Sequence, residues 1–391
     1  MDAKVYPGKL AGTVKAPPSK SVAHRAMLCD LFSGGRSKLS NMEWTEETLA
    51  TKNAVASILT KKEEEIDCCE SATTLRFMLI AAAALGKTAS FIGGQRVATK
   101  ALVPAVELLK KHGVSTASGD ALGWFPLTVD GKLRGETFFV RGDVSTQILS
   151  GLLLALPVIG RDCEIVLTSP LVSKDYIAVT LDVMEHFGIH VKVTEKGWMI
   201  RGKQNYEPRE FTIEGDYIYG AYFLGANLFP KGNVEITGLS PNSKLPDKAV
   251  LDILPALGHG LEVDVKDIPD CIPCMAVMAA FAPGKTTLIN AGRLRIKEND
   301  RLTVICEAVD KLGADIEVTD DTITVTGGKR MKGGVTVSSG QDHRIAMALI
   351  LGALGCEKPV VVTGVESILK SYPNFFRDFK LLGGLAELRE S

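Results

Sequence analysis

The sequence lacks the features that mark membrane, secreted and nucleic-acid-binding proteins. Its apolar runs, such as FMLIAAAALG and LLLALPVIG, fall well short of the roughly 18 residues that a membrane span needs. No basic segment followed by an apolar stretch opens the chain, so we expect no signal peptide. Lysine plus arginine (45) almost balance aspartate plus glutamate (46), which argues against non-specific binding to nucleic acid or membrane.

Cysteine is also too scarce for a disulfide framework, since the 391 residues include only eight. Reduced thiols in a cytoplasmic protein are the simpler interpretation. Cys271 and Cys274 form a C-x-x-C with no second pair nearby, and we interpret them as buried structural thiols rather than zinc ligands. We expect no metal and no cofactor. The segment FAPGKTTL at 281–288 lacks the first glycine of a phosphate loop, because Ala279 stands there, which argues against an ATP-binding kinase.

What the sequence does contain is a series of apolar stretches that each begin with a polar cluster. Nearly all their residues are hydrophobic or small, which is typical of helices buried inside a domain. The stretches are PPSKSVAHRAMLCDLF, ESATTLRFMLIAAAALG, GDVSTQILSGLLLALP, GDYIYGAYFLGANLF, IPDCIPCMAVMAAFA and DHRIAMALILGALG.

These stretches recur with a long period. Their anchor residues are Lys20, Ala72, Ser145, Asp216, Asp270 and Asp342. The second three anchors follow the first three by 196, 198 and 197 residues, which indicates a duplicated half with three units in each copy. A length above 300 residues also favours two domains over one core.

The segments between the buried stretches repeat as well. Four of them, including CEAVDKLGADIEV, have the pattern of an amphipathic helix followed by a strand. ADIEVTDDTITVTGG continues as a hairpin around Asp320 and Asp321. No hairpin follows SILTKKEEEIDC or LDILPALGHG, which explains why the first step of each half is short. We therefore predict two similar α/β domains, each of three strand-helix-strand-helix-hairpin units with one hairpin lost.

The polar clusters would converge if the buried helices of a domain run in the same direction. Each helix start presents unpaired N–H groups and a partial positive charge, which favour anions. Ser, Thr and Asp at these starts are also ordinary helix caps, and for any single helix that explanation is the better one. It does not explain why Lys and Arg recur at positive helix ends, which suggests a site for more than one anionic group.

Seven segments now give the chain a resemblance to the EPSP synthases, the 3-phosphoshikimate 1-carboxyvinyltransferases of the enolpyruvyl transferase superfamily. In order they are PPSKSVAHRA, ESATTLRF, GDVSTQ with LVSKDYI, IPD, GRLRIKENDRL, DHRIAMA and LKSYPNFF. The resemblance implies transfer of the enolpyruvyl group of phosphoenolpyruvate (PEP) to the 5-hydroxyl of shikimate 3-phosphate. It also implies two domains that close over the substrates, here 19–213 and 1–18 plus 214–391. We expect a monomer whose partners are these two small molecules.

The same resemblance implies roles for the matched residues. Shikimate 3-phosphate contacts are implied for Lys20, Ser21, Arg25, Ser145, Thr146, Gln147, Ser173, Asp270 and Lys297. Contacts with PEP are implied for Lys20, Ala72, Lys100, Gln147, Arg301, Arg344 and Lys370. Asp270 would be the acid/base that removes a proton, Glu298 the donor to the methylene carbon, and Lys20 an assistant at the hydroxyl.

Some positions depart from the family pattern. Ala72 stands where glycine is usual, and its methyl group would narrow the PEP pocket, so we expect weak inhibition by glyphosate. Lys100 replaces an arginine, and Arg293 replaces an asparagine. The stretch Tyr217–Gly220 replaces a pair of serines, which puts a substrate contact there in doubt.

Two alternatives stay open. The sister transferase that acts on UDP-N-acetylglucosamine normally carries a reactive cysteine on a mobile loop and a different first motif, and we find neither here. A non-catalytic anion-binding protein of the same fold would not need the two acids Asp270 and Glu298 beside Lys20.

Overall fold

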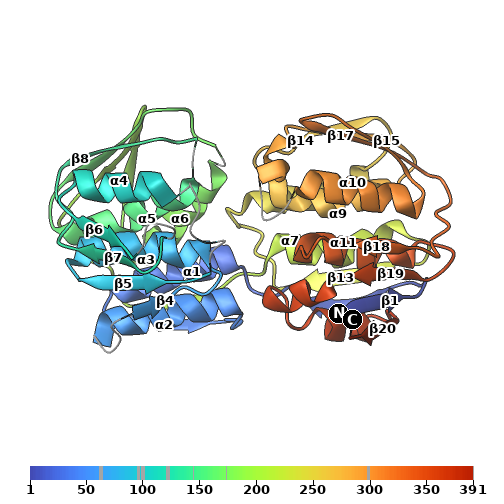
Figure 1. Cartoon of the computed structure of the whole chain (residues 1–391), viewed down its shortest axis with the longest axis horizontal. Coiled ribbons are helices and arrows are strands. Elements are labelled where there is room, and N and C mark those ends of the chain that lie inside the picture. Colours follow the sequence, from blue (N-terminus) through green and yellow to red (C-terminus); the bar gives the residue numbers. More distant parts are fainter. Residues whose placement is uncertain are drawn as a thin grey trace. The chain divides into compact units, whose positions relative to one another are not determined.

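The chain forms two units, described here from a computed structural model that covers residues 1–60, 65–94, 97, 102–119, 124–143, 145–172, 174–296 and 300–390. Unit 1 comprises Met1–Pro17 and Gly215–Ser391, and unit 2 comprises Pro18–Glu214. The chain therefore begins in unit 1, builds unit 2 as one continuous segment, and then returns to complete unit 1 (Figure 1).

Unit 2 alternates helices and short strands. Its helices are α1 (Lys20–Phe32), α2 (Glu46–Thr60), α3 (Ala72–Leu85), α4 (Val103–Lys111), α5 (Thr146–Ala155) and α6 (Asp175–His186). Its strands are β3 (Lys38–Ser40), β4 (Glu65–Asp67), β5 (Ala89–Ile92), β6 (Ser115–Ser118), β7 (Leu127–Asp130), β8 (Thr137–Val140), β9 (Cys163–Leu167), β10 (Val191–Thr194), β11 (Gly197–Ile200) and β12 (Glu210–Thr212). Helices α1, α3 and α5 come from the predicted apolar stretches.

Three sheets surround these helices, and two of them share one topology. Their strand orders are β4-β5-β7-β6 and β8-β9-β11-β10. In each, a parallel pair joined through a helix lies beside an antiparallel hairpin, as the predicted units require. The third sheet has only the parallel pair β3 and β12 among the described residues. The short step between Lys20 and Ala72 predicts that one hairpin is lost in this unit. It is the hairpin that would follow α2.

Unit 1 repeats this plan. Its helices are α7 (Tyr217–Gly225), α8 (Val250–Ala256), α9 (Ile272–Ala279), α10 (Arg301–Leu312), α11 (His343–Leu354) and α12 (Phe375–Leu381). Its strands are β1 (Asp2–Val5), β2 (Ala11–Lys15), β13 (Asn233–Thr237), β14 (Leu261–Asp264), β15 (Gly284–Ile289), β16 (Asp315–Val318), β17 (Thr322–Gly327), β18 (Thr336–Ser338), β19 (Val360–Thr363) and β20 (Ala386–Arg389). The hairpin predicted around Asp320 and Asp321 is β16–β17.

The sheets of unit 1 have the orders β14-β15-β17-β16, β18-β19-β1-β20 and the parallel pair β2-β13. In the second of these, β1 lies antiparallel between β19 and β20, so that Ala3 faces Val362 on one side and Leu388 on the other. The last hairpin is therefore built from the two ends of the chain, which Figure 1 shows as blue and red strands side by side.

The apolar helices form the cores, as their composition predicts. Ten residues of α3 and ten of α11 are buried, and so is every residue of α9. Three of the predicted helices are partly 3-10 helical: α5 and α7 end in the 3-10 turns Leu156–Ile159 and Ala226–Leu228, and α9 is preceded by the 3-10 turn Pro269–Cys271. The α3 helix ends at Gly86, whose φ of 63° is a left-handed cap conformation that favours glycine.

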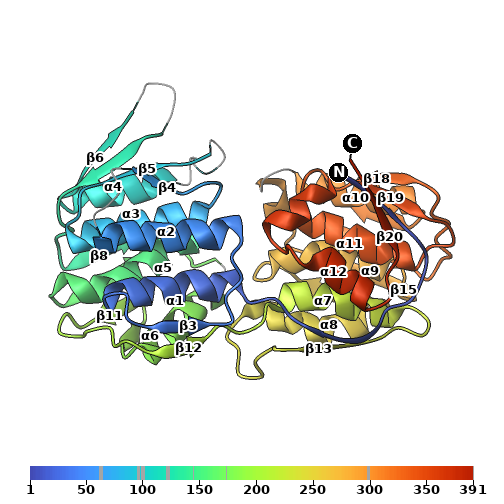
Figure 2. The ribbon, with the colours of Figure 1, turned by 90° about the horizontal axis from the view of Figure 1, so that it is seen from below.

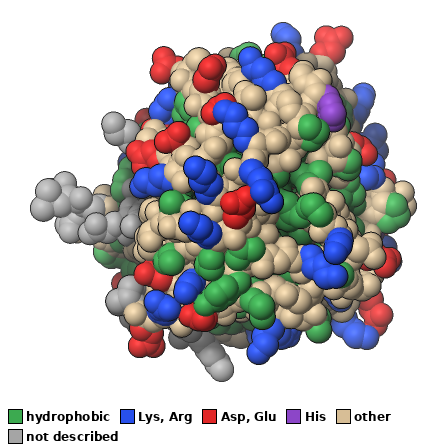
Figure 3. Space-filling view, turned by 90° about the vertical axis from the view of Figure 1, so that its right-hand side faces the viewer, with side chains coloured by type: hydrophobic (Ala, Val, Ile, Leu, Met, Phe, Trp, Pro, Cys, Tyr) green, Lys and Arg blue, Asp and Glu red, His purple; other side chains and the backbone are tan. Residues whose placement is uncertain are grey.

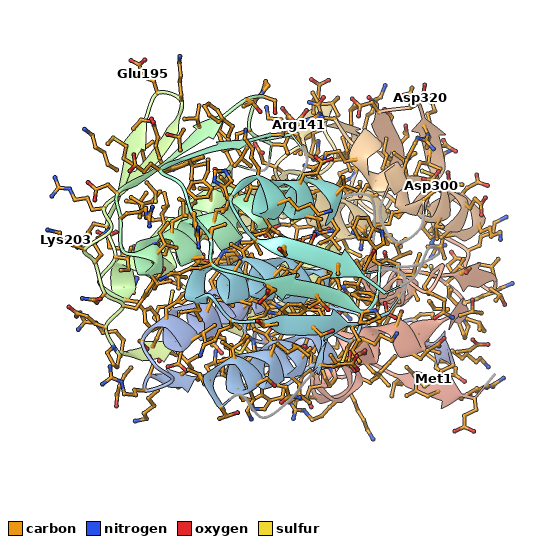
Figure 4. The ribbon with its side chains drawn as sticks, turned by 60° about the vertical axis from the view of Figure 1, so that its left-hand side comes forward. Met1, Arg141, Glu195, Lys203, Asp300 and Asp320 are labelled. Carbon is orange, nitrogen blue, oxygen red and sulfur yellow. The ribbon has the colours of Figure 1, made fainter. Side chains whose placement is uncertain are left out.

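The charged side chains lie outside these cores. On the face of unit 1 drawn in Figure 3, basic and acidic side chains are intermixed, which fits the formal net charge of −1. Glu195 and Lys203 project outward from turns of unit 2, and Asp320 does so from the β16–β17 hairpin (Figure 4). Within the described residues, no helix is long and apolar enough to span a membrane.

Candidate functional site

The six anchor residues all lie where a buried helix begins. Lys20 and Ala72 are the first residues of α1 and α3. Asp270 lies in the 3-10 turn that leads into α9. The remaining three are N-caps whose side chains accept hydrogen bonds from backbone N–H groups: Ser145 from Gln147, Asp216 from Ile218, and Asp342 from Arg344. Capping therefore explains three of the six positions.

In unit 1, two carboxylates and two guanidinium groups form one cluster at the starts of α9, α10 and α11. Asp270 Oδ1 lies 2.9 Å from Arg301 Nη1, and Asp270 Oδ2 lies 3.1 Å from Arg344 Nη2. The Nε atom of Arg301 donates to Asp342 Oδ2. The predicted PEP residues Arg301 and Arg344 are thus brought together by the predicted acid/base Asp270.

Two members of this cluster are almost fully buried, whereas Arg344 and Asp270 are 13% and 22% exposed. The Arg301 and Asp342 side chains are each only 2% exposed, so neither charge could be buried there without the other. Burial would lower the pKa of Arg344, but the neighbouring Asp270 carboxylate raises it well above the ordinary arginine value. The Nη1 atom of Arg344 is buried and has no hydrogen-bond partner among the described residues. It is a donor that can serve an anionic ligand.

The start of α7 differs from what its position in the repeat suggests. Tyr217 and Tyr219 are both buried, and the Tyr217 hydroxyl donates to the carbonyl oxygen of Ser240. The ring of Tyr219 packs 5.4 Å from that of Tyr372. These contacts give the stretch Tyr217–Gly220 a packing role in unit 1.

In unit 2, an ion pair joins the starts of α1 and α2. Lys20 Nζ lies 3.0 Å from Glu47 Oε2, and the two side chains are 17% and 34% exposed. The lysine is therefore partly accessible and held in one orientation by a carboxylate on the next helix. A lysine fixed in this way can neutralise an anionic substrate group or act on a hydroxyl proton.

Arg25 lies one helical turn further along α1 and is buried. Its guanidinium donates to Thr180 Oγ1 at 2.7 Å, to Ser21 O at 2.7 Å, and to Ser150 Oγ and Tyr176 O at 3.3 Å each. Burial lowers the pKa of Arg25 to about 10, so the group stays protonated at neutral pH. These partners come from α1, α5 and α6, and they fix the position of the charge.

A third set of contacts joins the starts of α3 and α5. Gln147 Nε2 donates to Thr73 Oγ1 at 2.7 Å, and Arg76 Nη1 donates to Gln147 Oε1. The neighbouring residues Ser145 and Thr146 are half-buried at the start of α5. Contacts thus join the starts of α3 and α5 within unit 2, and those of α9, α10 and α11 within unit 1.

The remaining predicted residues fall into two groups. Ser21 and Ala72 are half-buried in the first turns of α1 and α3, whereas Lys370 is exposed at the end of the 3-10 turn Val365–Lys370. Lys100, Ser173, Lys297 and Glu298 lie outside the described residues.

Glu47 and Asp342 supply carboxylates to these clusters, although the sequence predicted no role in the site for either residue. Glu47 lies in the first turn of α2, where an acidic side chain is ordinary, so nothing marked it as the partner of Lys20. Asp342 was an anchor of the repeat, and an aspartate two residues before an arginine at a helix start was the available signal. Its ion pair with Arg301, 41 residues away in the sequence, could be recognised only from the folded structure.

The C-x-x-C pair and the segment FAPGKTTL, for which the sequence predicted no role in the site, lie in or next to regular structural elements. Cys271 and Cys274 are buried and free, as predicted, and burial raises the pKa of Cys274 to about 12. The segment FAPGKTTL runs into strand β15 and not from a loop into a helix. No group of three or more metal-ligating side chains occurs in the described part of the chain.

Comparisons with known proteins identify the relatives of this chain. The sequence model of the family EPSP synthase (3-phosphoshikimate 1-carboxyvinyltransferase) matches residues 42–262 and 255–379. The 3-phosphoshikimate 1-carboxyvinyltransferase of Clostridioides difficile strain 630 is 36% identical, with 97% of each chain covered. The protein of the same name from Clostridium botulinum strain Eklund 17B is 37% identical, again with 97% of each chain covered.

Solved structures share the fold. An EPSP synthase from Acinetobacter baumannii matches with a TM-score of 0.85 over 100% of both chains, at 20% identity. The enolpyruvyl transferase NikO from Streptomyces tendae matches with a TM-score of 0.78, at 15% identity, over 99% of this chain and 98% of its own. These matches confirm the predicted α/β fold of the enolpyruvyl transferases.

Proposed function

Since the chain belongs to the EPSP synthase family, we propose that it transfers the enolpyruvyl group of PEP to the 5-hydroxyl of shikimate 3-phosphate and releases phosphate. The observation that carries the proposal is the partly buried cluster in which Asp270 contacts both Arg301 and Arg344. It places a carboxylate able to exchange protons beside two groups able to hold a phosphate and a carboxylate.

The chemistry divides into addition and elimination. In the addition, the 5-hydroxyl oxygen bonds to C2 of PEP, the hydroxyl loses its proton, and the methylene carbon C3 gains one. In the elimination, C3 loses a proton, the C2–C3 double bond re-forms, and the bond from C2 to the phosphate oxygen breaks. We propose Glu298 as the donor to C3, Asp270 as the group that removes a proton, and Lys20 as the assistant at the hydroxyl.

The proposed binding residues come from both units. Unit 2 contributes Lys20, Ser21, Arg25, Ala72, Lys100, Ser145, Thr146, Gln147 and Ser173. Unit 1 contributes Asp270, Lys297, Glu298, Arg301, Arg344 and Lys370. The proposal therefore requires groups from both units to reach the same pair of substrates during turnover, with water excluded as they do so.

Phosphate release from PEP tests this function directly. We expect release with shikimate 3-phosphate and none with UDP-N-acetylglucosamine. Release only with the UDP-sugar would indicate the sister transferase. Release with neither, together with retained binding of both anions in calorimetry, would indicate a binding protein.

We also propose that the protein is a cytoplasmic monomer. All eight cysteines are free, which suits a reducing compartment. Light scattering coupled to size-exclusion chromatography tests the monomer, because a dimer would double the 41.9 kDa mass of the chain.

A further inference from the structure

Two bridges of the same spacing join helices α1 and α2 in unit 2. Lys20 and His24 are four residues apart on α1, and Glu47 and Thr51 are four residues apart on α2. Lys20 pairs with Glu47, and His24 Nδ1 lies 2.7 Å from Thr51 Oγ1. Because residues four apart share a helical face, each bridge constrains the other. Figure 2 shows α1, α2 and α3 as neighbouring helices.

The second bridge continues into α3. Thr51 Oγ1 lies 2.6 Å from Thr74 Oγ1, and Thr74 Oγ1 donates to Ser71 Oγ at 2.7 Å. Ser71 is the N-cap of α3 and also accepts from the backbone N–H of Thr74 at 3.1 Å. All four residues are buried, with exposed fractions of 2% or less. We call His24, Thr51, Thr74 and Ser71 the hydroxyl chain.

The protons of the hydroxyl chain can be ordered. A threonine hydroxyl has one proton to donate. Both threonine hydroxyls also lie 3.4 Å from the carbonyl oxygen of Glu47, a longer contact than those within the hydroxyl chain. With the Thr74 proton given to Ser71, the 2.6 Å contact between the two threonines takes the proton of Thr51. Thr51 then has only a lone pair for His24, and Nδ1 must carry the imidazole proton.

The other ring nitrogen supports the same order. His24 Nε2 is buried and has no hydrogen-bond partner among the described residues. If the hydrogen bonds of the hydroxyl chain ran in the opposite direction, Nε2 would carry the imidazole proton. It would then be a buried donor without an acceptor. Unpaired buried N–H groups are rarer in proteins than unpaired acceptors. Burial also lowers the pKa of His24 to about 4, so the ring is neutral at physiological pH.

From this geometry we propose that His24 is a positioning residue, which through a one-directional hydroxyl chain fixes the start of α3 relative to Lys20 for PEP binding. The inference rests on the proposed function, because it takes Lys20 and Ala72 as the PEP contacts that must keep a fixed relation. Ser71 immediately precedes Ala72, so a change at Thr51 or His24 is transmitted to the substrate pocket without a direct contact.

Thr51→Val tests the proposal, because valine keeps the shape of threonine and removes its hydroxyl. We expect the KM for PEP to rise about tenfold, with kcat and the KM for shikimate 3-phosphate within about twofold of wild type. Thr48→Val is the matched control on the same helix. Thr48 is also buried and donates to Glu43 O at 2.7 Å, but it lies outside the hydroxyl chain. Equal kinetic effects of the two variants would overturn the proposal.

A ¹⁵N NMR spectrum of the wild-type protein gives a second test, which needs no substrate. With ¹⁵N-labelled histidine, we expect the His24 ring to show a protonated Nδ1 and a bare Nε2 at pH 7. Its signals are assigned in the wild type itself, from nuclear Overhauser contacts between the ring and Thr51. A proton on Nε2 would contradict the proposed order of donors in the hydroxyl chain, even if the variants fail to fold. Because no substrate is present, inactivity of the wild type would count against the proposed function and not against this order.

Discussion

At the scale of single residues, Asp270 combines its proposed acid/base role with an ion-pairing role that the sequence did not predict. Its two oxygens hold Arg301 and Arg344, and the same carboxylate is the proposed acid/base. A group fixed from both sides loses little further freedom when substrates bind, which favours a single geometry for proton transfer.

Asp270→Asn should therefore reduce turnover more than binding. We expect kcat to fall by about 10²–10⁴, the usual contribution of one proton-transfer group, with KM values changed far less. Steady-state phosphate release measures both quantities. Asp252→Asn, at an exposed position of α8, is the control. A raised KM with unchanged kcat would show that Asp270 only binds.

Ala72 should determine the response to glyphosate. Its methyl group projects from the first turn of α3, at the proposed PEP pocket. We expect poor inhibition of the wild type and inhibition of Ala72→Gly that is at least about tenfold tighter, a change of roughly 1.4 kcal/mol. Inhibition constants measured against varied PEP give the answer. Tight, PEP-competitive inhibition of the wild type would contradict the pocket argument.

His24 should make the fold sensitive to acid. Burial lowers its pKa from 6.5 to about 4, so between these values the unfolded chain binds more protons than the folded one. Stability is therefore lost as pH falls from 6.5 towards 4, by on the order of 3 kcal/mol. Urea unfolding of wild type and His24→Asn across this range measures the effect. Parallel pH profiles for the two proteins would exclude His24 as the source.

At the scale of single elements, the start of α11 shows how one side chain joins a helix cap to an ion pair. Asp342 Oδ1 accepts from the N–H groups of Arg344 and Ile345, while Oδ2 accepts from Arg301. Asparagine caps helices about as well as aspartate but carries no charge, so the two functions can be separated by substitution.

We expect Asp342→Asn to lower the free energy of unfolding by about 3 kcal/mol, because it leaves the buried Arg301 with one carboxylate fewer. Asp342→Ala should cost about 1 kcal/mol more, the usual value of a lost N-cap. Urea denaturation at pH 7 measures both differences. Equal stability of the two variants would mean that the cap contributes nothing and that the ion pair accounts for the whole loss.

The elements also show how far the sequence could predict this fold. The period of about 197 residues predicted the duplicated units, and the short steps predicted which sheets lack a hairpin, because spacing is preserved along a chain. Contacts between distant segments leave no such trace. The pairing of Lys20 with Glu47 and the chain from His24 to Ser71 depend on how α1, α2 and α3 pack, which polar residues in first turns do not reveal.

At the scale of the whole molecule, the two units differ in how the chain builds them. Unit 2 is one continuous segment, Pro18–Glu214, with its own buried helices, whereas unit 1 combines the N-terminal segment with everything after Gly215. A continuous segment with a complete core is expected to fold without the rest of the chain.

A fragment of residues 18–214 should therefore unfold cooperatively in urea, as followed by circular dichroism. It should release no phosphate from PEP, because Asp270, Arg301 and Arg344 belong to unit 1. The full chain in the same buffer is the control. A gradual, non-cooperative loss of signal would show that unit 2 depends on unit 1 for its structure.

The position of β1 imposes an order on synthesis at the ribosome. Ala3 is made long before its neighbours in the sheet, Val362 and Leu388. At a translation rate of about 5–20 residues per second, β1 is made roughly 20 to 80 seconds before these partners. During that time the continuous unit can form while β1 stays unpaired outside the exit tunnel. Strand β1 thus pairs only after β19 and β20 have been made, so a change beside β1 would affect a late step in the assembly of unit 1.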